Sequence, residues 1–80
     1  MSYRIAFAPV AEEALGKLPS PNRFKTALAR TLGADPYGHG STPVGGDQDR
    51  REAVVSQVIV RYVISTGILT ITVVRLIPEP

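Results

Sequence analysis

The chain of 80 residues contains no cysteine, which excludes both disulfide bonds and thiolate metal sites as sources of stability. Its single histidine, His39, cannot form a zinc site alone. No segment approaches the roughly 18 apolar residues that a membrane helix requires, and the N-terminus lacks the apolar run of a signal peptide. We therefore expect a cytoplasmic protein without a membrane anchor, and we assign it no metal and no cofactor.

A large excess of charge of one sign is also missing. Nine lysines and arginines against seven aspartates and glutamates give a net charge of +2, which is too small for nucleic-acid binding by bulk attraction. The placement of the arginines must decide whether an anionic partner binds. The length predicts one domain, residues 1–80, and a core of this size supplies only about 3–5 kcal/mol of net stability.

The first part of the chain predicts a strand followed by two helices. Residues 3–7 alternate with the period of a strand that has one buried face. Pro9 suits the first position of a helix, and the segment 18–21 breaks that helix before a second one that Ser20 or Asn22 caps. Each helix carries one apolar stripe, so both should cover the same face of a sheet and leave the other face open.

The middle of the chain has neither helical nor strand periodicity. Gly33 is the expected C-terminal cap of the second helix. Residues 34–49 are rich in glycine, proline and aspartate, which are typical of turns and irregular segments. We therefore predict a flexible loop over residues 34–49.

The last third predicts three strands. Residues 58–64 and 68–74 are rich in β-branched side chains, and only a short segment with Thr66 and Gly67 separates them. This pattern predicts a hairpin that turns at Thr66 and Gly67. The whole chain then has an α+β fold of order β-α-α-β-β-β, in which a helical hairpin packs on one face of a small, mostly antiparallel sheet.

The turns decide which side chains share a face. A two-residue turn at 66–67 places Arg61 opposite Thr72 on the open face, and a second one at 56–57 brings Glu52 opposite Arg61. A three-residue loop at either turn would reverse the assignment. On the two-residue pairing, the open face carries one polar patch made of Arg50, Glu52, Arg61, Thr70 and Thr72.

Several segments together resemble a known family. The most specific is Leu32 followed by Asp35-Pro36-Tyr37-Gly38-His39-Gly40 after a helical hairpin. The others are Tyr3 to Phe7 with Ala8-Pro9 and Ala11, then Ala14, Leu15 and Leu18-Pro19, and finally Val58 to Tyr62 leading to Val73-Val74-Arg75. With this order of elements, nearly the whole chain resembles the RelE/ParE superfamily of toxins from type II toxin–antitoxin systems.

This resemblance implies a small toxin that inhibits growth and is neutralised by a cognate antitoxin that wraps around it. RelE-like members enter the ribosomal A site and cleave mRNA without a metal: basic residues of the open face bind the scissile phosphate, and the ribose 2′-OH is the nucleophile. The implied function is therefore a ribosome-dependent mRNA endonuclease that inhibits translation. Two alternatives remain: a ParE-like inhibitor of DNA gyrase, and a catalytically inactive relative that only binds an antitoxin.

The chain differs from the family pattern on its open face. Members commonly have an arginine three residues before the tyrosine that corresponds to Tyr62, and here that position is Ile59. Glu52 and Val54 stand where the preceding strand commonly carries basic residues. Arg61 is then the candidate for a displaced phosphate contact from the same face.

We accordingly name Arg61 and His39 as candidate catalytic residues, and Arg50, Arg51, Arg61 and Arg75 as candidate RNA phosphate ligands. His39 qualifies because its unperturbed pKa lies near neutrality, although the neighbouring glycines do not fix its position. Each candidate also has a structural alternative. Arg61 and Glu52 can form an ordinary cross-strand ion pair, and Arg51 and Arg75 can be charges that protect strand ends. Packing is the expected role of Tyr62.

Overall fold

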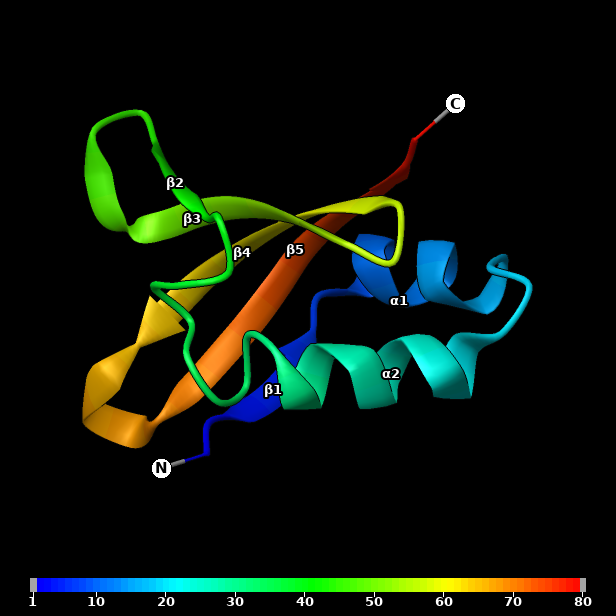
Figure 1. The fold of residues 1–80 in the computed structure, drawn as a ribbon, viewed down its shortest axis with the longest axis horizontal. Coiled ribbons are helices and arrows are strands. Elements are labelled where there is room, and N and C mark those ends of the chain that lie inside the picture. The colour runs from blue at the N-terminus through cyan, green and yellow to red at the C-terminus, as the bar shows by residue number, and fades with distance from the viewer. Residues whose placement is uncertain (1, 80) are drawn as a thin grey trace.

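The computed structural model describes residues 2–79, which fold into two helices on a five-stranded sheet (Figure 1). The helices are α1 (Pro9–Gly16) and α2 (Pro21–Arg30), and the strands are β1 (Arg4–Phe7), β2 (Thr42–Val44), β3 (Asp47–Val55), β4 (Val58–Ser65) and β5 (Thr70–Pro78). The order in the sheet is β1-β5-β4-β3-β2, and β1 runs parallel to β5 while the other neighbours are antiparallel. The predicted α+β fold is confirmed.

Both helices begin at prolines: α1 at Pro9, as predicted, and α2 at Pro21, which the sequence pattern assigned to the break between the helices. Pro9 and Pro21 occupy the first turns of α1 and α2, where a missing backbone N–H costs no hydrogen bond. Ser20 is the N-cap residue of α2, although its side chain makes no capping hydrogen bond. Thr31, and not Gly33 as predicted, is the C-cap residue of α2. Gly33 has a steric role instead, because a Cβ at this position would lie 2.6 Å from the carbonyl oxygen of Ala29.

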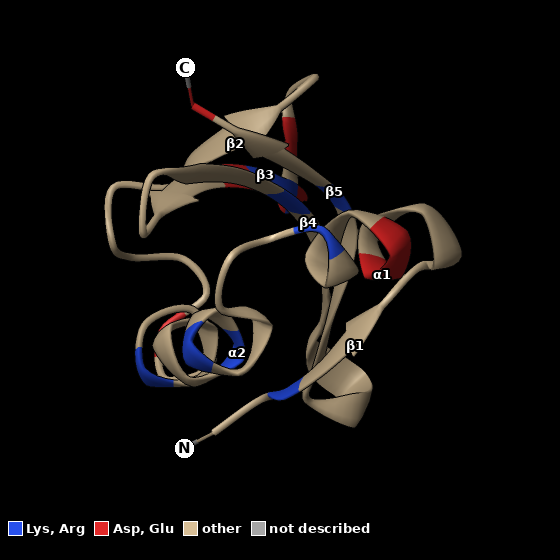
Figure 2. Cartoon of the chain, turned by 90° about the vertical axis from the view of Figure 1, so that its right-hand side faces the viewer, with Lys and Arg blue, Asp and Glu red and all other residues tan. Residues whose placement is uncertain are grey.

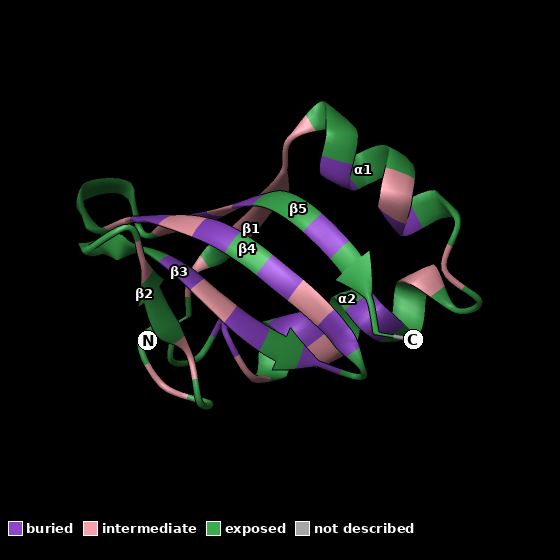
Figure 3. Ribbon diagram, turned by 90° about the horizontal axis from the view of Figure 1, so that it is seen from above, coloured by how far each residue is buried: buried purple, intermediate pink, exposed green. Residues whose placement is uncertain are grey.

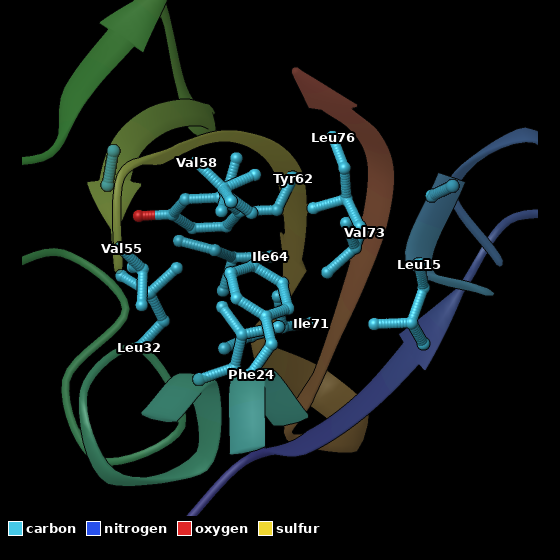
Figure 4. Close-up of a cluster of buried hydrophobic side chains, with 14 residues drawn as sticks. Leu15, Phe24, Leu32, Val55, Val58, Tyr62, Ile64, Ile71, Val73 and Leu76 are labelled. Carbon is cyan, nitrogen blue, oxygen red and sulfur yellow. The ribbon is translucent and has the colours of Figure 1, made fainter. Parts of the chain in front are cut away.

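The core lies between the two helices and one face of the sheet. Figure 4 shows Phe24 of α2 beside Ile64 and Ile71, with Leu15 of α1 on the side of Val73. Along β4 and β5 buried positions alternate with more exposed ones, as the period of a strand requires (Figure 3). The helices therefore cover one face only, and the opposite face of the sheet stays open.

The prediction of a flexible loop over residues 34–49 is wrong for the second half of this segment. Residues 42–44 form β2 and Asp47 begins β3, so a hairpin stands where no strand was predicted. Gly45 and Gly46 both have positive φ angles, which allow the tight turn between the strands. Three residues are too few for a recognisable period, and Pro43 is tolerated because β2 is an edge strand.

The predicted turn between β3 and β4 is confirmed. Ser56 and Gln57 have φ angles of 49° and 66°, as expected for a two-residue hairpin turn whose central residues are both left-handed. Val55 consequently pairs with Val58, and Glu52 pairs with Arg61.

The predicted connection between β4 and β5 is wrong. Four residues, 66–69, separate the strands, and they include the 3-10 helix η1 (Thr66–Ile68) and Leu69 with φ 48°. The pairing is therefore shifted by two residues, with Ile64 opposite Ile71 and Tyr62 opposite Val73. A shift of two keeps every side chain on its face, so Tyr62 and Ile71 are core residues as predicted.

A β-bulge changes the far half of the same strand pair. Tyr62 pairs with Val73, whereas the preceding residue, Arg61, pairs with Arg75, so Val74 is one extra residue in β5. Arg61 therefore faces Arg75, whereas the sequence pattern predicted that it faces Thr72. Because Leu76 then returns to the core opposite Val60, the bulge places Arg75 on the open face.

Candidate anion-binding site

Side chains on the open face lie in rows that cross β3, β4 and β5. The central row consists of Glu52, Arg61 and Arg75, which are direct cross-strand neighbours. The row on one side consists of Arg50, Val63 and Thr72, and the row on the other side consists of Val54, Ile59 and Ile77. Basic positions thus lie on all three strands of the open face (Figure 2). The predicted patch is present, and the bulge adds Arg75 to it.

A cavity of about 320 Å³ brings these arginines together. It is lined by Val44, Arg50, Arg51, Arg61, Tyr62, Val63, Val74 and Arg75. All four arginines that the sequence indicated as phosphate ligands belong to this lining, which contains no acidic residue. A recess with several guanidinium groups and apolar walls favours an anion, because the low polarity strengthens charge-assisted hydrogen bonds. We call it the arginine cavity.

Arg61 forms an ion pair with its neighbour in the central row. Its Nε lies 3.3 Å from Oε1 of Glu52, and both side chains are partly exposed. The pair matches the structural alternative that the sequence left open. Exposed pairs of this kind contribute only about 0–1 kcal/mol to stability, so the pair does not by itself explain why both residues are present.

Arg51 differs from the other arginines because its guanidinium group is bound by the protein itself. Nε donates to Oγ of Ser41 at 2.9 Å, and Nη2 donates to the carbonyl oxygen of the same residue at 3.1 Å. Nη1 donates to the backbone and side-chain oxygens of Gln48, both at 3.2 Å. Only 7% of Arg51 is exposed, and its position opposite Tyr62 lies on the helix-covered face. Arg51 therefore anchors Ser41, which precedes β2, and Gln48 of β3, while its role as an RNA phosphate ligand stays a prediction.

Two tyrosines complete this anchoring. The hydroxyl of Tyr62 donates to the carbonyl oxygen of Pro36 at 2.6 Å, and burial raises the pKa of Tyr62. Tyr62 is thus a core residue, as expected. The hydroxyl of Tyr37 donates to Asp49 at 2.7 Å, which raises the pKa of Tyr37 to about 12. The guanidinium carbon of Arg51 lies 5.4 Å from the centre of the Tyr37 ring.

The fold does not place His39 at the arginine cavity. It is exposed, has a φ angle of 57°, and does not line the arginine cavity. In the neighbouring turn, a Cβ on Gly38 would lie against the side-chain carboxylate of Asp35. The same turn carries the carbonyl oxygen of Pro36 that Tyr62 contacts.

Within residues 2–79, no group of three histidine, aspartate or glutamate side chains is placed to hold a metal ion. The helices in the described part of the chain are too short or too polar to cross a membrane.

Two features of the site could not be read from the sequence pattern. The bulge that turns Arg75 toward Arg61 needs one unpaired residue, and nothing in the run Ile71 to Val74 marks which residue this is. Val44 reaches the cavity because residues 42–44 form an edge strand. The turn signal Gly45-Gly46 was the one indication of that hairpin.

Comparison with known proteins identifies the fold of this chain. No family model matches the chain, and no curated protein matches it. Among solved structures, it is similar to a chain of the toxin–antitoxin complex RelBE2 from Mycobacterium tuberculosis, with a TM-score of 0.80, 20% identity, and coverage of 99% of this chain and 100% of that one. It is also similar to a chain of the archaeal RelE–RelB complex from Pyrococcus horikoshii OT3, with a TM-score of 0.74, 22% identity, and coverage of 99% and 97%. The resemblance inferred from the sequence is therefore confirmed as a RelE-like fold.

Proposed function

We propose that residues 1–80 form a single toxin domain of a type II toxin–antitoxin system, and that this toxin is a ribosome-dependent mRNA endonuclease of the cytoplasm. The observation that carries the proposal is the arginine cavity, where Arg50, Arg61 and Arg75 meet on the open face without an acidic residue in the lining. The fold shared with chains of RelBE complexes supports the toxin role.

In the proposed reaction, the cavity binds the scissile phosphate of an mRNA. The ribose 2′-OH attacks the adjacent phosphorus to form a 2′,3′-cyclic phosphate, and the bond from phosphorus to the 5′-oxygen breaks. The departing 5′-oxygen takes a proton from solvent or from a group of the ribosome. During the attack, negative charge accumulates on the non-bridging oxygens. Arg61 and Arg75 stabilise this charge with guanidinium donors that are already in place before the reaction. His39 lies outside the cavity lining, so the proton of the 2′-OH leaves to solvent or to a group of the ribosome.

The cognate antitoxin fits the same face. The apolar row of Val54, Ile59 and Ile77 lies beside the central row with Arg61 and Arg75. An antitoxin segment that presents apolar side chains next to acidic ones is complementary to both rows. Such a segment would neutralise the toxin by occupying the arginine cavity.

The test is growth after induced expression, compared between the wild type and variants of the cavity. Arg61→Ala and Arg75→Ala should abolish growth arrest, whereas Arg30→Ala, an exposed arginine of α2 outside the cavity, should retain it. Primer extension on translated messages should show new 5′ ends within the reading frame for the wild type and the control. Growth arrest that survives Arg61→Ala would contradict the proposal.

One observation favours a second candidate, a ParE-like inhibitor of DNA gyrase that cleaves nothing. The cavity lining contains no histidine or carboxylate, and the hydroxyl of its one tyrosine, Tyr62, is bound to Pro36. A gyrase supercoiling assay separates the candidates, because only the second predicts inhibition by the purified protein. Absence of growth arrest, with binding of an antitoxin retained, would indicate an inactive relative.

A further inference from the structure

The contact between Glu52 and Arg61 has a particular geometry. The carboxylate oxygen binds Nε of Arg61, which is the nitrogen nearest to the side-chain stem. Within residues 2–79, the terminal nitrogens Nη1 and Nη2 of Arg61 donate no hydrogen bond to protein atoms. Arg61 lines the arginine cavity, whereas Glu52 does not. The carboxylate therefore holds the guanidinium group from outside the cavity and leaves the two terminal nitrogens available.

The neighbour of Arg61 on β5 explains why Arg61 needs a counter-charge. Arg75 is its direct cross-strand neighbour, and like charges in this position repel each other. Without a counter-charge, the flexible side chains of Arg61 and Arg75 would turn away from each other into solvent. Glu52 lies on the other neighbouring strand, directly opposite Arg61, and offsets this repulsion. In the row of Glu52, Arg61 and Arg75, the carboxylate is thus the counter-charge of the middle guanidinium group.

We propose that Glu52 is a positioning residue of the arginine cavity, which fixes the guanidinium group of Arg61 through Nε so that its two terminal nitrogens are presented to a phosphate group. This inference rests on the proposed function, in which the cavity is the phosphate site. It assigns a use to an acidic residue at a position where the RelE/ParE resemblance leads one to expect a basic one.

Glu52 acts on a bound anion in two opposite ways, and two substitutions separate them. Its negative charge repels the anion, while its hydrogen bond orders Arg61. Glu52→Gln removes the charge and keeps an oxygen acceptor at the same place. Glu52→Ala removes both. Because the two variants have the same net charge, a difference in their affinities does not arise from net charge, and the Nε–H signal of Arg61 shows whether it arises from the hydrogen bond.

The experiment measures binding of one short oligoribonucleotide to the full chain by ¹H–¹⁵N NMR, at low and at physiological salt. We expect Glu52→Gln to bind more tightly than Glu52→Ala by about 2- to 10-fold, as expected when one mobile side chain must be ordered on binding. This ratio should persist at the higher salt concentration, because a local hydrogen bond is screened less than a longer-range charge effect. The Nε–H signal of Arg61 should remain protected in Glu52→Gln and lose its protection in Glu52→Ala.

The matched control is the pair Glu13→Gln and Glu13→Ala. Glu13 forms an exposed ion pair with Lys17 on α1, with 3.7 Å between Oε1 and Nζ, outside the cavity. Both control variants change the net charge as the Glu52 variants do, and they should bind the oligoribonucleotide equally well. Equal affinities of Glu52→Gln and Glu52→Ala, or tighter binding by Glu52→Ala, would overturn the inference.

A further variant separates failure of the inference from failure of the proposed function. If Arg61→Ala weakens binding while the two Glu52 variants bind equally, the phosphate site stands and the positioning role is wrong. If Arg61→Ala binds as tightly as the wild type, the cavity is not the phosphate site, and both proposals are wrong.

Discussion

Arg51 and Arg61 lie on neighbouring strands but on opposite faces of the sheet, and they have different environments. Arg51 faces the helix side, where Ser41 and Gln48 accept hydrogen bonds from all three of its nitrogen atoms. Arg61 faces the open side, where one carboxylate binds one nitrogen and 45% of the side chain is exposed. The comparison teaches that the face, and not the residue type, decides whether an arginine stabilises the fold or is available to a ligand.

The largest expected effect contrasts the two faces within β5. Ile71 is completely buried and Ile77 is 38% exposed on the open face. Ile71→Ala should lower the free energy of unfolding by about 2–5 kcal/mol, because it removes buried methyl groups and leaves a cavity. Ile77→Ala is the matched control and should cost much less. Urea denaturation followed by circular dichroism measures both, and similar losses would contradict the assignment of the faces.

The next effect applies the comparison to the two arginines. Arg51→Ala should lower the free energy of unfolding by about 1.5–3 kcal/mol, because charge-assisted hydrogen bonds to Ser41 and Gln48 are lost. Arg61→Ala should cost only about 0–1 kcal/mol, as expected for an exposed ion pair. The same denaturation measurement applies. The comparison fails if Arg61→Ala is the more destabilising of the two.

A smaller effect concerns two tyrosines that anchor the loop before β2. Tyr62→Phe leaves the buried carbonyl oxygen of Pro36 without its 2.6 Å hydrogen bond and should cost about 1–2 kcal/mol. Tyr37→Phe removes a hydrogen bond to Asp49 at the surface and should cost about 0.5 kcal/mol or less. Thermal unfolding of both variants measures the difference. Equal shifts of the midpoint would contradict the burial of Tyr62.

The smallest effect appears at alkaline pH. Burial raises the pKa of Tyr62 in the folded state, so folding favours its protonated form. This contribution is complete below the unfolded pKa of about 10 and is lost as the pH rises through the folded-state pKa. The wild type should therefore lose stability above about pH 10 more steeply than Tyr62→Phe. Unfolding midpoints measured from pH 8 to pH 11 test this, and parallel curves would contradict it.

The sequence was sufficient to predict the fold where the turns and the apolar periods are regular. The turn at Ser56 and Gln57 follows from the two strand patterns around it, and it correctly placed Glu52 opposite Arg61. Pro9 correctly indicated where α1 begins, and Ser20 was one of the two predicted N-cap residues of α2. Apolar spacing was a less exact guide: Val10 lies four residues before Ala14, so the two share the apolar stripe of α1, but Val10 is 66% exposed in the first turn. A period shows which residues share a stripe, whereas packing decides which of them are buried.

The sequence was insufficient to predict the structure where a local irregularity of the backbone decides how strands and side chains are placed. The connection after β4 contains a 3-10 turn and a left-handed Leu69, which no strand propensity predicts. The role of Arg51 was hidden because its partners lie in a segment without periodicity. The cavity itself needs the bend of the β2–β3 hairpin and the extra residue in β5, and both depend on tertiary packing.

The extra residue Val74 has a consequence for how β5 tolerates a change in its length. Val73 and Leu76 are three residues apart, which would place them on opposite faces of a regular strand, yet both lie in the core because the bulge takes up one residue. The strand pair can therefore accommodate one additional residue at this point while Arg75 stays on the open face and Leu76 stays in the core.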